Sequence, residues 1–75
     1  MTAMIDWSQC AAVERSTDRV SGAWCFRGTR VPVTALLENL EGGATIQDFL
    51  ERFPGILPPQ VKGVLEHLRR SLESE

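Results

Sequence analysis

Residues 58–73 read PPQVKGVLEHLRRSLE, and this stretch decides the fold. Its apolar side chains recur at the spacing i, i+3, i+4, i+7, which is typical of one face of an α-helix and which strand alternation cannot produce. The members of this apolar stripe are Val61, Val64, Leu65, Leu68 and Leu72. Two prolines precede the stripe, where a missing N–H costs little. We therefore predict the longest helix of the chain near residues 59–73.

The segment that follows Pro32 has the same helical spacing. Its apolar positions are Val33, Leu36, Leu37 and Leu40. Pro32 is compatible with a helix start, and Gly42 with Gly43 is typical of a helix C-cap. These signals predict a helix near residues 33–41.

A third periodic segment lies between these two. Its apolar positions are Ile46, Phe49, Leu50 and Phe53. Thr45 is a favourable N-cap, and Asp48 stands three residues later in a capping-box position. Because Pro54 and Gly55 favour a stop, we predict a helix near residues 46–53.

The first 32 residues favour extended structure. Their strand-forming residues include Val20, Trp24, Phe26 and Val31. Turn signals stand at Ser21-Gly22 and at Gly28-Thr29. We predict a short hairpin with strands around 23–26 and 30–32 that turns at residues 27–29, and a further strand near Val13.

Together these segments predict a mainly α fold, a three-helix unit with a short N-terminal β-hairpin. We expect a single domain over residues 1–75, with a hairpin arm at 1–32 and a three-helix unit at 33–75. The second and third helices with their connection resemble a helix-turn-helix. Compact three-helix units also serve as dimerisation modules and as protein-binding domains, so helix number alone does not choose between these functions.

Size and charge narrow the class of protein. A chain of 75 residues has a marginal core, and such chains often gain stability by self-association. The net charge of −2 argues against nucleic-acid binding by bulk electrostatics. The spacing of Cys10 and Cys25 fits neither a zinc site nor a multi-disulfide framework, which predicts free thiols. The first seven residues lack the pattern of a signal peptide, and we expect a cytoplasmic protein with no membrane role.

The third helix offers candidate contacts to nucleic acid. Helical spacing places Gly63, Glu66 and Arg70 opposite the apolar stripe. Gln60 can pair with adenine and Arg70 with guanine or phosphate. The alternative is a solvated face with ion pairs between Glu66 and Arg70 and between Arg69 and Glu73.

The predicted turn adds guanidinium groups from Arg27 and Arg30, which can bind phosphate or a partner's carboxylates. The alternative is a turn with solvated arginines. The full set of predicted nucleic-acid contacts is Arg27, Arg30, Gln60, Lys62, His67 and Arg70.

Aromatic residues are candidates for a partner or dimer interface. We predict such an interface at Trp24 and Phe26, because a partly apolar hairpin can add its edge to a second copy. The alternative for Trp24, as for Trp7, is a place in the core.

Catalysis is disfavoured by the residue inventory. His67 is the only histidine, and nucleophilic or acid–base catalysis needs a base together with an orienting group. We expect His67 to be a surface residue. The sequence has no phosphate-cradling glycine loop and no metal-ligand spacing, so we expect no enzyme, no metal and no cofactor.

The junction between hairpin and first helix carries a resemblance. Residues 22–33 read GAWCFRGTRVPV, and they are followed by Leu36-Leu37, Leu40 and Gly43. This run is similar to the bacterial family called domain of unknown function 433. The similarity continues through Thr45-Ile46, Phe49-Leu50, Phe53-Pro54, Val61 and Val64-Leu65, and it covers roughly residues 7–73.

The resemblance implies a homeodomain-like helical fold, a tendency to dimerise and membership in toxin–antitoxin-like gene pairs. The usual partner would be a nuclease-like toxin of the PIN type. We therefore expect an antitoxin-like regulator, a homodimer that binds such a toxin, with operator DNA as a second candidate ligand. The alternative is a dimeric interaction or scaffold module with no DNA role. The near-neutral third helix argues against strong DNA binding, whereas the acidic helical half suits the basic face of a nuclease.

Overall fold

The computed structural model describes residues 5–15 and 23–73. Along the chain it contains the 3-10 turn η1 (Trp7–Gln9), strands β1 (Val13–Arg15) and β2 (Trp24–Phe26), and helices α1 (Val33–Glu41), α2 (Ile46–Arg52) and α3 (Pro58–Glu73). The predicted class, mainly α with an N-terminal β-hairpin, is confirmed. Each helix boundary falls within one residue of its predicted position.

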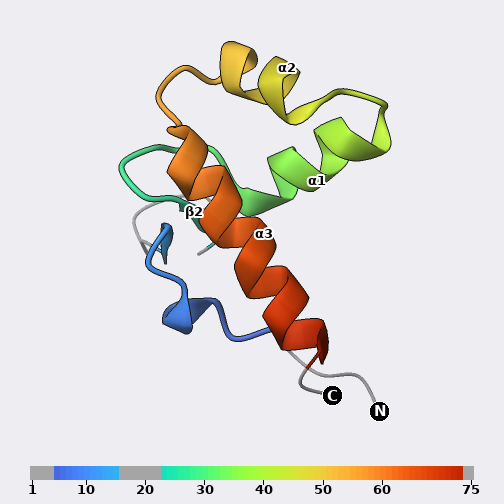
Figure 1. Ribbon diagram of the computed structural model, residues 1–75. Coiled ribbons are helices and arrows are strands. Elements are labelled where there is room, and N and C mark those ends of the chain that lie inside the picture. The colour runs from blue at the N-terminus through green and yellow to red at the C-terminus, as the bar shows by residue number, and fades with distance from the viewer. Residues whose placement is uncertain (1–4, 16–22, 74–75) are drawn as a thin grey trace.

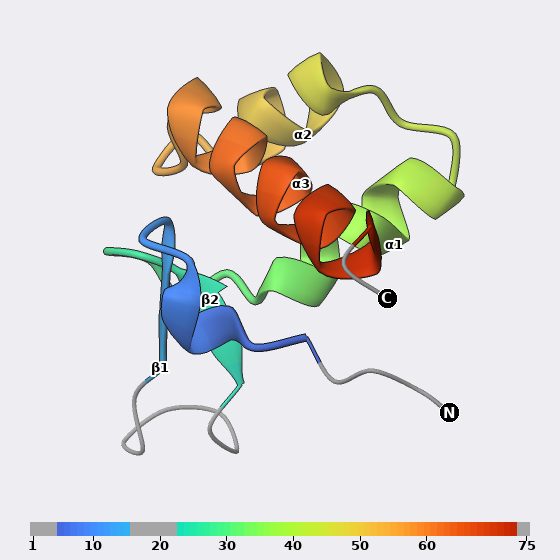
Figure 2. The same ribbon diagram turned by 60° about the horizontal axis from the view of Figure 1, so that its bottom comes forward.

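Helix α3 crosses the molecule and is flanked on two sides. Figures 1 and 2 show the N-terminal segment with η1 and β1 along one side of α3, and helices α1 and α2 on the other. No helix in the described part of the chain is long and apolar enough to span a lipid bilayer.

The strand pairing differs from the prediction. β2 pairs antiparallel with β1, with Val13 opposite Phe26, rather than with residues 30–32. The latter contribute only an isolated bridge between Cys25 and Pro32. Proline lacks the N–H that a ladder needs, and α1 begins at the next residue, so no strand can extend there. The strand predicted near Val13 is therefore a principal strand of the hairpin, and the predicted turn at 27–29 follows β2 instead of joining the pair.

Both junctions around the first two helices are fixed by local hydrogen bonds. At the end of α1 the N–H of Ala44 donates to the Asn39 carbonyl and the N–H of Gly43 donates to the Leu40 carbonyl, both at 3.0 Å. This is a Schellman motif, and it requires the left-handed backbone of Gly43 (φ 95°). The capping box predicted for α2 is confirmed: Thr45 and Asp48 exchange two hydrogen bonds of 3.0 Å.

One core joins the hairpin to the three helices. Its buried members are Cys10, Val13, Phe26, Val33, Leu36, Phe49, Ile56, Val61 and Val64. The Phe26 and Phe49 rings lie 5.8 Å apart, so strand β2 packs directly against α2. The described residues before and after residue 33 thus share a single apolar interior.

Candidate functional site

The turn after β2 is held from within the chain. The Arg27 guanidinium donates to the carbonyls of Ala11 and Val13 at 2.9 and 2.8 Å, and it lies 3.7 Å from the Glu14 carboxylate. Glu14 also accepts from the N–H of Gly28 at 2.8 Å, where a left-handed backbone (φ 80°) completes the turn. Arg27 therefore ties the turn to β1, although more than half of its side chain is exposed (57%).

Gln60 anchors the same turn to α3. Its amide oxygen accepts from the N–H of Leu57 at 2.9 Å, which satisfies a donor at the start of the helix. Its amide nitrogen donates to the carbonyl of Arg27 at 3.0 Å. Both polar groups that were predicted to read adenine are thus used inside the molecule.

The N-terminal segment covers the flank of α3 that was predicted to be exposed. The backbone of Gly63 lies so close to this segment that a Cβ atom placed there would be 3.3 Å from the Cβ of Ala12. The thiol of Cys10 donates to the Gly63 carbonyl at 3.9 Å. The prediction that Gly63 belongs to an open face is therefore wrong. The spacing of residues around one helix shows which side is polar, but it does not show which other segment of the chain covers that side.

His67 joins the same contact. Its Nε2 lies 2.8 Å from the carbonyl oxygen of Asp6, and its ring lies 5.1 Å from that of Trp7. His67 is half-buried rather than the plain surface residue that was expected. Asp6 accepts hydrogen bonds from the hydroxyl and the N–H of Ser8, which hold the pKa of its carboxyl below the usual range.

The remaining nucleic-acid candidates lie on the surface. Arg30, Lys62 and Arg70 are exposed, and their side chains make no hydrogen bond or ion pair within residues 5–15 and 23–73. On the same helix Arg69 forms the expected pair with Glu73, with nitrogen–oxygen distances of 2.9 Å. The six predicted residues therefore divide equally between internal anchors and exposed cations.

The two aromatic candidates have different environments. Phe26 is fully buried (0% exposed) in the core of the monomer, so it offers no surface to a partner in this structure. Trp24 is half-buried, and the Arg15 guanidinium lies 4.9 Å from the centre of its ring. Strand alternation does not explain this difference, since residues 24 and 26 are two positions apart and face the same side of β2. The core covers Phe26 fully, whereas Trp24 only packs against its edge.

Trp24 lines an apolar groove that the sequence did not reveal. This Trp24 groove has a volume of about 350 Å³. It is lined by Ile5, Trp7, Ala23, Trp24, Pro32, Val33, Thr34, Leu37 and Leu68. These residues come from the N-terminal segment, β2, α1 and α3, so only the tertiary fold brings them together.

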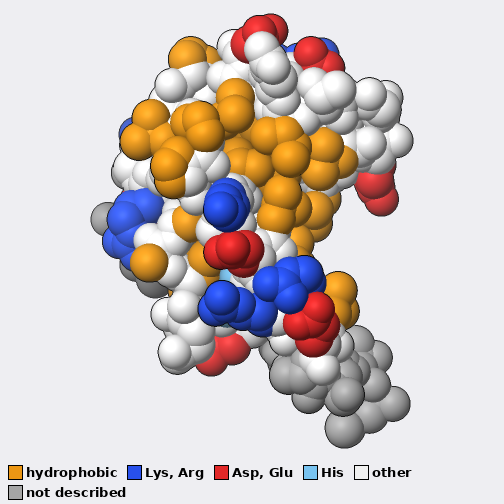
Figure 3. Space-filling model, viewed as in Figure 1, with side chains coloured by type: hydrophobic (Ala, Val, Ile, Leu, Met, Phe, Trp, Pro, Cys, Tyr) orange, Lys and Arg blue, Asp and Glu red, His pale blue; other side chains and the backbone are white. Residues whose placement is uncertain are grey.

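A second groove, the α2–α3 groove, has a volume of about 310 Å³. It is lined by Ile46, Pro58, Val61, Lys62, Leu65, Glu66 and Arg69. It has an apolar floor and charged side chains on its α3 side. Figure 3 shows an extended apolar surface bordered along α3 by alternating basic and acidic side chains.

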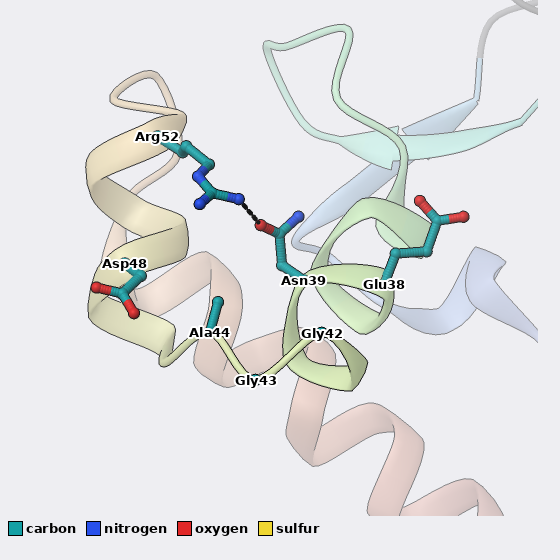
Figure 4. Close-up of a pocket in the computed structure, with 7 residues that line it drawn as sticks. All are labelled: Glu38, Asn39, Gly42, Gly43, Ala44, Asp48 and Arg52. Atoms are coloured by element: carbon teal, nitrogen blue, oxygen red, sulfur yellow. Dashed lines mark hydrogen bonds between the residues drawn. The ribbon is translucent and has the colours of Figure 1, made fainter.

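A polar hollow of about 470 Å³ lies where α1 turns into α2. Arg52 donates to the Asn39 amide oxygen across it at 2.7 Å, as Figure 4 shows. The N–H of Thr45 is the main reason that the pKa of Asp48 lies below its usual range. Glu38 points away from Arg52. These groups hold α1 against α2, and they do not converge on a point where a ligand would sit.

Comparison with known proteins places the chain in a family. Residues 13–68 match the family described as "Protein of unknown function (DUF433)". The chain belongs to this family. No curated protein and no solved structure matches it.

The part that matches the DUF433 family runs from β1 to the third turn of α3. It includes the Arg27–Arg30 turn, Gln60 and most of the lining of both grooves. Within the described residues of this DUF433 chain, His, Cys, Asp and Glu side chains form no group that could hold a metal ion. Among the described residues, the two grooves and the exposed cations are candidate surfaces for function.

Proposed function

We propose that this chain is an antitoxin-like protein that binds a nuclease-like toxin of the PIN type, and that the Trp24 groove is its contact surface. The observation that carries this proposal is the groove itself, an apolar concavity that four separate segments build around a half-buried tryptophan. Tryptophan is one of the residue types that are enriched among the side chains with the largest contributions to protein–protein binding energy.

Charge favours a protein partner over nucleic acid. The chain carries ten acidic against eight basic residues, and three of the six cations and polar groups expected on DNA are engaged in internal bonds. A nuclease needs a basic face for RNA, and the net acidic charge of this chain favours its approach to such a face. The lining of the Trp24 groove itself is uncharged, so in this proposal the groove supplies apolar contact. In this proposal the protein acts in the cytoplasm as a homodimer.

Operator DNA is the second candidate ligand. The exposed side chains of Arg30, Lys62 and Arg70 support it, because free guanidinium and ammonium groups bind phosphates. Such binding would weaken steeply with rising salt, with a slope set by the number of phosphates contacted. DNA affinity that is absent at low salt would remove this candidate and leave a protein-binding module without a DNA role.

The test of the main proposal is co-expression of the chain with a PIN-type nuclease encoded beside its gene. We expect the two proteins to co-purify after nuclease treatment, and we expect ribonuclease activity to fall when the chain is added to the isolated nuclease. A host with no such neighbouring gene, or a nuclease whose activity and elution volume are unchanged by the chain, would contradict the proposal.

A further inference from the structure

A row of alternating charges runs along α3. Its members are Lys62, Glu66, Arg69 and Glu73. At 100° per residue these positions fall within about 60° of one another on the helix circumference. The row therefore reads plus, minus, plus, minus along one edge of α3. Figure 3 shows that basic and acidic side chains gather next to one another on this face of the molecule.

An uncovered apolar strip lies beside this row. Leu65 and Pro58 line the α2–α3 groove, Ile46 is 40% exposed on its α2 side, and Leu72 is 64% exposed in the last turn of α3. Small monomeric domains rarely leave a contiguous apolar surface open next to a charged border, because that arrangement is the anatomy of an interface.

The charge row is complementary to itself when it is reversed. In an antiparallel pair of helices related by a two-fold axis, the same edge of each helix meets, with its residue order inverted. Lys62 of one copy then lies opposite Glu73 of the other copy, and Glu66 lies opposite Arg69 in the same way. The two-fold axis repeats both pairs. A parallel arrangement in register would oppose like charges at all four positions.

We propose that the α2–α3 groove is an isologous dimer interface whose occupant is the same face of a second copy, with the two α3 helices antiparallel. The apolar strip then packs against its own equivalent while the charge rows meet at the rim. This inference deepens the proposed function, since it supplies the surface for the homodimer that the proposal includes.

The length of the row suits such an interface. Lys62 and Glu73 lie eleven residues apart, which is about 16 Å along the helix. The exposed pair of Arg69 with Glu73 contributes little within one chain, so the carboxylate can turn to a second cation at small cost. The rim charges then fix orientation and register, while the apolar strip supplies most of the affinity.

The dimer leaves the Trp24 groove open. The two grooves share no lining residue: Leu65 faces the α2–α3 groove and Leu68 faces the Trp24 groove. A dimer built on one face can therefore hold a different protein on the other.

The test is sedimentation velocity of the full chain between micromolar and submillimolar concentrations, with charge-reversal variants. Arg69→Glu and Glu66→Arg each place like charges opposite one another, and we expect each to weaken the dimer at least tenfold. The double variant E66R/R69E restores opposite charges in the antiparallel register and should regain most of that loss. Arg70→Glu is the matched control, because this cation is exposed on α3 outside the row.

Three results would overturn the inference. They are a monomeric wild-type chain at the highest concentration, a dimer that Arg69→Glu and Glu66→Arg leave unchanged, and single variants whose loss the double variant does not reverse. Far-UV circular dichroism of each variant establishes that the helices persist. As a further control on the apolar strip, Ile46→Glu should also dissociate the dimer, and a dimer that tolerates it would place the interface elsewhere.

This experiment contains no toxin, so its failure is separable from that of the proposed function. A monomer that still captures a PIN-type nuclease would overturn the dimer alone. A dimer that captures none would overturn the antitoxin proposal alone. If the nuclease protects the α2–α3 groove from hydrogen exchange, that face belongs to the toxin and the inference is wrong.

Discussion

The side-chain amide of Gln60 donates to the backbone carbonyl of Arg27 at 3.0 Å, across 33 positions of sequence. This bond joins the first turn of α3 to the turn that follows β2. The same amide accepts from the Leu57 N–H, so one side chain caps a helix and fastens a loop. Gln60 is therefore a structural anchor of the turn.

Replacing Gln60 by alanine tests this role. Gln60→Ala removes two hydrogen bonds, and we expect the free energy of unfolding to fall by about 1–2 kcal/mol. Gln47 is exposed on α2 and its side chain forms no hydrogen bond within the described residues, so Gln47→Ala serves as the control with little change. Urea denaturation measures both variants. Equal stabilities would show that the anchor contributes nothing.

Alanine substitutions of the two arginines of the turn should have different effects on the free energy of unfolding, measured by the same urea denaturation. Arg27→Ala leaves the carbonyls of Ala11 and Val13 without their donor, and we expect a loss of about 1–2 kcal/mol in the free energy of unfolding. Arg30→Ala removes an exposed cation and should change it by less than about 0.5 kcal/mol. The reverse order would contradict the assignment of Arg27 as an anchor. It follows that Arg30→Ala tests a DNA contact at the turn without destabilising the fold, whereas Arg27→Ala does not.

Adjacent glycines at the end of α1 offer another matched pair. Gly43 has a φ of 95°, which disfavours an L side chain, whereas Gly42 has a φ of −79°. We expect Gly43→Ala to lower the free energy of unfolding by about 1 kcal/mol and Gly42→Ala to be neutral or slightly stabilising. Thermal melts of both variants decide the point. Equal losses would mean that the left-handed cap is not what disfavours the alanine.

Acid should weaken the fold through its depressed carboxyl groups. The pKa of Asp48 is lowered mainly by the N–H of Thr45, and that of Asp6 by Ser8. A carboxyl whose pKa is lower in the folded than in the unfolded chain contributes stability above its unfolded pKa. That contribution is lost as pH falls through the folded pKa. Stability should therefore decline below about pH 4.

Asp48→Asn isolates one of these carboxyl groups. The variant should lose stability at neutral pH and show a shallower decline below pH 4, with Asp6 sustaining the rest. Glu51→Gln is the control, because Glu51 is exposed on the same helix and its side chain makes no hydrogen bond within the described residues. Denaturant titrations between pH 2 and 7 compare the three proteins. An unchanged acid slope in Asp48→Asn would contradict the capping role of the charge.

The helices were predictable because their signals are local. Periodic apolar residues, the capping box of Thr45 with Asp48 and the left-handed cap at Gly43 act within a few residues of one another. The strand pairing was not predictable from local signals, since it depends on which distant segment pairs with β2. Sequence spacing favoured the near segment at 30–32, but Pro32 limits it to a bridge and β1 takes the place.

The candidate site was predictable in composition but not in geometry. The exposed cations Arg30, Lys62 and Arg70 were identified from their positions on a turn and a helix face. Gln60 and His67 looked equally available, because no local pattern shows that the turn or the N-terminal segment will occupy them. The two grooves draw on several segments each, and they appear only when the core has formed.

The central claim is that the Trp24 groove binds a PIN-type nuclease, and calorimetric titration with two matched variants tests it most directly. Leu37 is 36% exposed and lines this groove, whereas Leu57 is 60% exposed and lines neither groove. We predict that Leu37→Glu weakens nuclease binding by at least a hundredfold and that Leu57→Glu leaves it within about twofold of wild type. Equal affinities for the two variants, or a wild-type chain that does not bind the nuclease, would contradict the account.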